Sequence, residues 1–251
     1  MLEIINTSPS PLQNYLLAVL PKDVQARLFP FIELVTLPSA QVLYDAGDKL
    51  AYVYFPVDAI VALLHVTENG ASTEVSMVGN EGLVGFALFM GGESTSSRAV
   101  VQSAGYAYRL KGTVLTAEFN RHGELLELML RYTQSLMTQM AQGVVCNRHH
   151  SIDQQLCRWL LFSLDRLPDN HLVMTQELIA NMLGVRREGV TEAARKLQKL
   201  EVIDYYRGHI TVLDRAQLET LSCECYRVVK KETDRLLPDV FVAIGSLQLV
   251  R

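Results

Sequence analysis

One segment in the C-terminal third constrains the fold of this chain more than any other. Thr175–Leu183 has helical apolar periodicity, starts with a residue that can cap a helix, and is followed by Gly184. A second periodic segment, Arg186–Leu200, comes directly after it. Glycine readily adopts the left-handed conformation that ends a helix, so the pattern predicts a helix-turn-helix. Two β-prone runs around Arg207-Gly208 then predict a hairpin, or wing.

The second helix of this motif is predicted to have one apolar and one polar face. Val190, Ala193, Ala194 and Leu197 share the inward face. The outward face carries Arg186, Arg187, Glu188, Thr191, Glu192 and Arg195. A DNA major groove admits such a helix, since Arg can bond guanine and Glu can accept from cytosine. The alternative is a solvated face with ion pairs such as Glu192–Lys196, which are four residues apart.

The charge distribution favours the DNA-binding interpretation. The net charge of −4 argues against nucleic acid for the chain as a whole. However, residues 1–170 hold 11 basic against 16 acidic residues, whereas Arg186–Lys199 holds five basic against two. Basic charge is therefore local to one short segment, as expected for a DNA-reading helix on an acidic protein.

The N-terminal half has a different character. Nine of the fifteen glycines lie between Gly47 and Gly112, where they separate short β-prone runs. This spacing predicts an antiparallel β-roll or barrel. The predicted strands are Gln41–Tyr44, Tyr52–Phe55, Ile60–Val66, Thr73–Val78, Ala99–Gln102 and Tyr106–Leu110. Two short helices are expected before them, within Leu12–Phe31.

A long helix is predicted after the strands, over about residues 118–148. Its apolar stripe comprises Leu125, Met129, Tyr132, Leu136, Met140 and Val144. The stripe fits either a core face within one chain or a seam between two chains, and its length favours the dimer seam.

The chain is therefore predicted to be an α+β protein with two domains. Residues 1–148 would form a β-roll with a long dimerisation helix, and residues 149–251 a winged helix-turn-helix with a C-terminal extension. Asp153 is the expected N-cap of a helix over 154–167, which places the hinge between the domains at Asn147–Asp153. A further helix of unassigned purpose is expected over Gln217–Leu237.

The run MLGVRREGV at residues 182–190 and the run GHITVLD at residues 208–214 resemble the DNA-binding domain of the Crp/Fnr family of transcription regulators. The β-roll, the long helix and the hinge follow in that family's order. The resemblance implies a homodimer whose roll senses an effector. By position it implies base contacts from Arg187 and Glu188, and phosphate contacts near Thr175 and Gln176. Glu192 departs from the family, where a second base-reading arginine is common, so a different operator is expected.

The family's cyclic-nucleotide pocket is only partly matched. Gly85 retains a glycine, but Phe86 stands where a carboxylate would hold the ribose. Arg98 retains a cation, and Ala99 replaces a hydroxyl. Cyclic AMP is therefore not the expected effector. Two hypotheses remain: a protein that binds DNA without an effector, or one controlled by an unidentified nucleotide or other anion. The second would use a tentative set of residues: Gly82, Gly85, Arg98, Ala99 and Gln142. The alternative for Arg98 is a strand arginine that extends to solvent or forms an ion pair with Glu81 or Glu93.

No metal site or resident cofactor is expected from the sequence. Residues 1–145 contain no cysteine, unlike the oxygen-sensing branch of the family with its N-terminal iron–sulfur ligands. Cys223-x-Cys225 is tighter than the usual spacing of zinc knuckles, and His149-His150 is expected to lie apart from it, at the hinge between the domains. Haem has no recognisable ligand motif here.

The remaining expectations concern class and location. The chain has no Gly-x-Ser-x-Gly, no His-Glu-x-x-His and no P-loop, so it is not expected to be an enzyme. It shows neither a secretion signal nor an apolar stretch long enough for a membrane span, which predicts a cytoplasmic protein. The expected partners are double-stranded DNA, a second copy of the chain, and RNA polymerase if the protein is an activator. The alternative is a cyclic-nucleotide-like protein-interaction module without DNA binding. The sequence does not indicate the operator or the direction of control.

Overall fold

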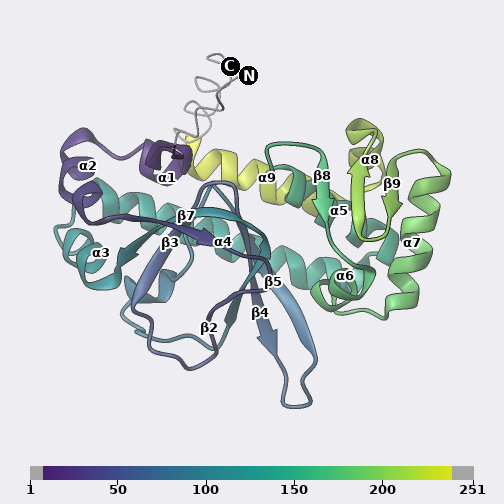
Figure 1. Cartoon of the computed structure of the whole chain (residues 1–251), viewed down its shortest axis with the longest axis horizontal. Helices are drawn as coiled ribbons and strands as arrows, with labels where there is room; N and C mark the ends of the chain where they lie inside the picture. The colour runs from purple at the N-terminus through teal and green to yellow at the C-terminus, as the bar shows by residue number, and fades with distance from the viewer. Residues whose placement is uncertain (1–7, 239–251) are drawn as a thin grey trace, which may run out of the picture.

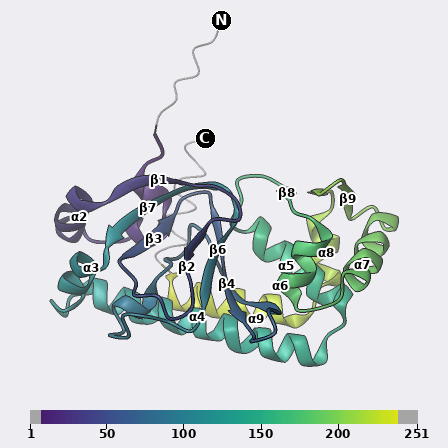
Figure 2. The ribbon, with the colours of Figure 1, turned by 60° about the horizontal axis from the view of Figure 1, so that its bottom comes forward.

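The computed structural model describes residues 8–238. Figure 1 shows a β-rich part at one end of an elongated molecule and a mostly helical part at the other. In Figure 2 a long helix, α4 (Glu124–His149), runs beneath both parts. No helix of the described part is both long and apolar enough to cross a membrane.

Four short helical segments come first. They are η1 (Pro11–Gln13), α1 (Tyr15–Ala18), α2 (Lys22–Leu28) and η2 (Phe29–Phe31). Asn14 fixes them to the roll, because it caps α1 and its amide also donates to the carbonyls of Pro56 and Gly82, each at 2.9 Å. The two predicted helices correspond to α1 and α2.

The roll consists of two antiparallel sheets. Its strands are β1 (Glu33–Leu37), β2 (Val42–Tyr44), β3 (Tyr52–Pro56), β4 (Ile60–Val66), β5 (Ser72–Val78), β6 (Arg98–Ser103) and β7 (Gly105–Lys111). The sheet orders are β1-β7-β3 and β2-β6-β4-β5. All six predicted strands are confirmed. The sequence prediction missed β1, whose exposure does not alternate along the strand.

The helical segment after the roll is divided. The predicted long helix is confirmed as α4, but its predicted start near residue 118 was wrong. α3 (Gly112–Phe119) ends before α4 begins at Glu124. Between them His122 has a φ of 57°, which an α-helix cannot accommodate.

The predicted stripe on α4 is mostly a core face. Leu125, Met129, Tyr132 and Leu136 are buried against the roll, whereas Val144 is 72% exposed. Most of these residues therefore form a core face within one chain, and the prediction that the stripe is a dimer seam was wrong for them. The opposite face of α4 carries the exposed apolar side chains Leu130, Met137 and Val144.

The link to the next helix is short. α5 (Ile152–Leu164) begins after Ser151, which forms a reciprocal capping box with Gln154. The prediction that Asp153 caps this helix was therefore wrong, since Asp153 lies in its first turn. Only His150 and Ser151 separate α4 from α5, so the connection is narrower than the predicted hinge.

The winged helix-turn-helix follows α5 and a short strand. Its elements are β8 (His171–Val173), α6 (Gln176–Leu183), α7 (Arg187–Lys199), β9 (Ile203–Tyr206) and β10 (His209–Val212). The hairpin prediction is confirmed, with φ of 49° at Arg207 and 87° at Gly208, as a two-residue turn of type I′ requires. The additional strand β8 pairs with β10 and makes the wing three-stranded.

Two helices end the described chain, so the prediction of one helix over Gln217–Leu237 was wrong. α8 (Arg215–Leu221) and α9 (Glu224–Leu236) are separated by Ser222 and Cys223, which have extended backbone. α9 turns back and packs along α4 (Figure 2). Ser135 of α4 and Thr233 of α9 share a hydrogen bond of 2.8 Å.

The two parts of the molecule share an apolar core. Ile60, Ala62, Leu64 and Met77 of the roll belong to the same buried cluster as Trp159 and the inner faces of α6 and α7. The β4–β5 strands therefore pack against the helix-turn-helix and hold its orientation relative to the roll.

Candidate nucleic-acid interface

The first helix of the motif is fixed by its two ends. The Thr175 hydroxyl accepts a hydrogen bond from the backbone N–H of Leu178, which confirms the predicted cap. Gly184 has a φ of 67°, which confirms the left-handed turn residue. Ala180 is buried, and its small side chain permits the close approach of α6 and α7.

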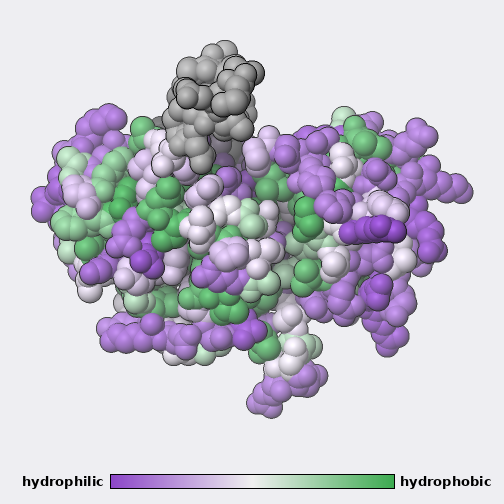
Figure 3. Space-filling model, viewed as in Figure 1, coloured by the Kyte–Doolittle hydropathy of each residue, from purple (hydrophilic) through white to green (hydrophobic). Residues whose placement is uncertain are grey.

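The second helix presents the predicted faces. Val190, Ala193, Ala194 and Leu197 are buried in the shared core. Five of the predicted outward residues are exposed: Arg186, Arg187, Glu188, Glu192 and Arg195. Figure 3 shows hydrophilic side chains predominating at the α7 end of the molecule. The cationic side chains are thus on a convex, accessible surface, as groove insertion requires.

The sixth outward residue, Thr191, is half-buried and connects the two helices. Its hydroxyl donates to Gln176 Oε1 at 2.6 Å and to the Arg187 carbonyl at 3.0 Å. This contact brings Gln176, predicted to touch the DNA backbone, beside the predicted base-reading positions. The bond also orients the Gln176 amide, since its oxygen is occupied and its N–H₂ group is left to donate.

The ion-pair alternative holds for part of the face. Lys196 Nζ lies 3.2 Å from Glu192 Oε1 and 3.0 Å from Asp153 Oδ2, on the first turn of α5. Within residues 8–238 no ion pair engages Arg186, Arg187 or Arg195. Three guanidinium groups can therefore contact a polyanion without first breaking a salt bridge.

The wing adds a cation that the sequence prediction did not include. Arg207 lies over the exposed Tyr206 ring, with its guanidinium carbon 5.0 Å from the ring centroid. In the same sheet the rings of His171 on β8 and His209 on β10 are in contact, with 3.2 Å between their nitrogens. The sequence had placed Arg207 in the hairpin turn but had not assigned it to the DNA-binding set.

The tentative effector residues lie in the roll and on α4. Gly85 has a φ of 98° and stands before the short helix η3 (Phe86–Leu88). Gly82 lies under the Tyr132 ring, whose hydroxyl oxygen would be 2.6 Å from an added Cβ. Ala99 is buried in the roll. Phe86 is half-buried and packs against both apolar clusters of the roll.

Arg98 and Gln142 are not brought together. Arg98 forms an ion pair with Asp45, and not with Glu81 or Glu93 as the sequence alternative had it. Gln142 instead donates to Cys225 Sγ at 3.2 Å. A cavity of about 250 Å³ is lined by the β2–β3 connection and adjoining strand residues, 43–44, 48–52 and 54, and includes neither Arg98 nor Gln142.

The sequence argument that separated His150 from the cysteines was wrong. His150 Nδ1 lies 3.3 Å from Cys225 Sγ, because α9 folds back onto the end of α4. The detectable sequence pattern was the four-residue spacing of Cys146 and His150, which places both on one helix face.

The fold and this interface define a winged helix-turn-helix protein with a β-roll domain. Two family models match the chain: the cyclic nucleotide-binding domain over residues 34–122 and the Crp-like helix-turn-helix domain over residues 154–221. Together they span more than half of the sequence. The chain belongs to the Crp/Fnr family of transcription regulators.

Solved structures share the fold at low sequence identity. The chain is similar to a putative Crp/Fnr-family transcriptional regulator from Eubacterium rectale, with 18% identity, a TM-score of 0.62, and coverage of 83% of this chain and 98% of that one. It is also similar to FixK2 from Bradyrhizobium japonicum, with 15% identity, a TM-score of 0.63, and coverage of 76% and 98%. A third similar structure is that of the c-di-GMP-responsive global regulator CLP of Xanthomonas campestris, with 12% identity, a TM-score of 0.62, and coverage of 77% of this chain and 100% of that one. No curated protein sequence matches the chain.

Proposed function

We propose that the protein is a homodimer that reads a specific DNA sequence through α7 and so regulates transcription in the cytoplasm. The observation that carries this proposal is the exposed α7 face, on which Arg186, Arg187 and Arg195 have no ion-pair partner in the described chain. Arg187 and Glu188 begin the helix, at the end that enters the major groove in helix-turn-helix proteins. RNA polymerase is a further proposed partner if the protein activates.

The proposed dimer forms along α4. Leu130, Met137 and Val144 recur at seven-residue steps and are 53%, 62% and 72% exposed. Gln134 and Ala141 lie between them on the same exposed face. Apolar residues with this repeat are typical of a coiled-coil seam. Because α9 packs on the neighbouring face of α4, this seam remains accessible to a second copy.

The proposed effector is not cyclic AMP. Phe86 cannot accept the hydrogen bonds of a ribose, and each buried hydroxyl left unpaired costs about 1–3 kcal/mol. Asp45 also competes for the Arg98 guanidinium. Arg98 stays a predicted contact for another anion. Calorimetry with cyclic mono- and dinucleotides, comparing the wild type with Arg98→Ala, tests it; absence of heat with both proteins removes the hypothesis.

Selection of bound fragments from a random DNA pool tests the function. We expect a near-palindrome whose half-sites are one helical turn, about 34 Å, apart. If no sequence is enriched and mobility shifts are absent at low salt, the protein is instead an interaction module without DNA binding. A second selection with metabolites from cell extract shows whether binding requires an effector.

A further inference from the structure

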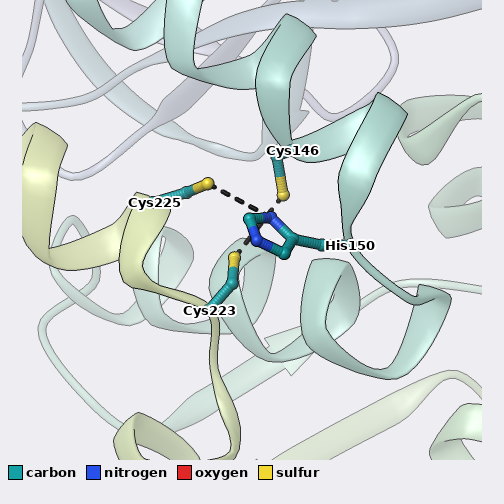
Figure 4. A group of neighbouring side chains, drawn as sticks. All are labelled: Cys146, His150, Cys223 and Cys225. Atoms are coloured by element: carbon teal, nitrogen blue, oxygen red, sulfur yellow. Dashed lines mark hydrogen bonds between the residues drawn. The ribbon is translucent and has the colours of Figure 1, made fainter.

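Four side chains with metal-binding atoms meet where α9 lies against the end of α4. Cys146 comes from the last turn of α4, His150 directly follows that helix, and Cys223 and Cys225 flank the start of α9 (Figure 4). The three Sγ atoms and the imidazole nitrogen all lie within 4.8 Å of one another. The cysteines are at most 4% exposed, and the His150 side chain is 12% exposed.

The local backbone explains how the four side chains converge. The His150 N–H donates to the Cys146 carbonyl at 3.0 Å, so these two residues are one helical turn apart on the same face. Cys223 has extended backbone before α9, and Cys225 is in the first turn of that helix. This change of conformation directs both thiols toward α4 despite their short spacing, which the sequence argument had judged too tight.

Two of the distances between the ligand atoms come within a few tenths of an ångström of those around a single tetrahedral ion. Cys146 Sγ and Cys223 Sγ are 3.6 Å apart, and Cys225 Sγ is 3.3 Å from His150 Nδ1. Bonds of about 2.3 Å to sulfur and about 2.0 Å to nitrogen separate tetrahedral ligands by roughly 3.5–3.8 Å. An iron–sulfur cluster distributes its ligands over different iron atoms and so needs a wider arrangement.

The surroundings supply the outer contacts of a metal site. His150 Nε2 lies 3.3 Å from Glu224 Oε2, which leaves Nδ1 as the nitrogen facing the thiols. A ligating histidine usually donates its other N–H to a carboxylate in this way. The Gln142 amide donates to Cys225 Sγ at 3.2 Å, a bond that stabilises a thiolate.

We propose that Cys146, His150, Cys223 and Cys225 bind one Zn²⁺ ion that fastens α9 to the end of α4. Three thiolates and one neutral imidazole are the ligand set of a closed, structural zinc site. Binding releases the three thiol protons to solvent and leaves the ion with its four ligands one negative charge. The site adjoins the two-residue link between α4 and α5, so the ion restrains the segment that joins the roll to the helix-turn-helix.

Metal analysis of the full-length protein tests the site. We expect about one zinc per chain after purification without chelator. After removal of zinc, added Co²⁺ should give the thiolate charge-transfer and d–d absorption of a tetrahedral cobalt site. The double variant Cys223→Ser/Cys225→Ser should bind zinc at least about 100-fold more weakly, because loss of ligands exceeds the 10- to 100-fold effect of outer contacts.

Two further variants separate metal binding from folding. Cys157 is buried in α5 outside the cluster, so Cys157→Ser should retain full zinc content. Glu224→Gln changes a mostly exposed side chain and should weaken zinc affinity by about 10- to 100-fold while leaving the circular dichroism spectrum unchanged.

The opposite results overturn the proposal. The first is a wild-type protein that takes up neither zinc nor cobalt. The second is a Glu224→Gln variant whose zinc affinity is unchanged. The third is a mass spectrum of the non-reduced protein that shows a Cys146–Cys223 disulfide in place of the metal. These experiments measure metal binding and not DNA binding. A negative result would therefore overturn the zinc site without affecting the proposed function.

Discussion

Replacement of Arg187 by alanine is the most direct test of how α7 reads DNA. Arg187 is the first residue of α7, is exposed, and has no ion pair within residues 8–238. No salt bridge has to break when it contacts a base, so a bidentate bond to guanine should contribute its full value. That value is about 1–3 kcal/mol, or roughly a 5- to 150-fold loss of affinity for the selected operator.

The assay is fluorescence anisotropy with the operator and with single-base variants, repeated over a range of salt concentrations. We expect Arg187→Ala to bind the operator more weakly and to lose discrimination at one base pair of each half-site. Arg121→Ala is the control, because it removes an exposed cation beside α3, at the other end of the molecule (Figure 1). Arg121→Ala should keep the affinity for the operator within about twofold of the wild-type value, since surface charges far from the interface act weakly at physiological salt.

One pattern of results would refute the base-reading assignment. If Arg187→Ala weakened all DNA sequences equally and lowered the salt slope by about 1, Arg187 would be a phosphate contact. If affinity did not change, α7 would not be the reading helix.

Three further predictions concern assembly and stability. Met137→Glu places a charge in the proposed α4 seam and should shift the protein to monomer in light scattering, whereas Lys22→Glu, at an exposed position of α2 outside this seam, should not; a persistent dimer would place the interface elsewhere. Gly184→Ala should lower the free energy of unfolding by about 1–2 kcal/mol, because φ is 67° and the new Cβ would lie 2.7 Å from Thr73 Oγ1; Gly70→Ala has a φ of 84° but no neighbour within 4 Å, so an equal loss there would show that the Thr73 contact does not matter. Burial raises the pKa of Glu74 to about 7, against the weaker opposing effects of Arg158, Trp159 and Arg166. The native state therefore binds this proton more tightly than the unfolded state does, so this group's contribution to stability falls as pH rises from about 4.5 to 7. Urea titrations should show Glu74→Gln to be more stable than wild type at pH 8, with the gap closing near pH 4; a gap independent of pH would contradict this.

Local patterns in the sequence determined much of the fold. Short β-prone runs separated by glycines located six of the roll strands, and the cap–glycine–helix pattern located both helices of the motif with Thr175 and Gly184 in their predicted roles. These features depend on backbone preferences within a few residues, which sequence carries directly. The amphipathic pattern of α7 likewise predicted which arginines would be exposed. Its apolar residues lie on one face, which is buried in the core, so the arginines on the opposite face remain in solvent.

Tertiary packing alone decided the rest. The apolar stripe of α4 was compatible with a core or a dimer. Only the position of the roll showed that Leu125, Met129, Tyr132 and Leu136 face inward while Leu130 and Met137 face outward. Ser151 rather than Asp153 caps α5, because this helix begins at Ile152, two residues earlier than the sequence pattern predicted. The convergence of Cys146 and His150 with Cys223 and Cys225 could not be read from spacing, since more than 70 residues separate the pairs. A contact between distant segments depends on the path of the whole chain, and here the return of α9 along α4 fixes it.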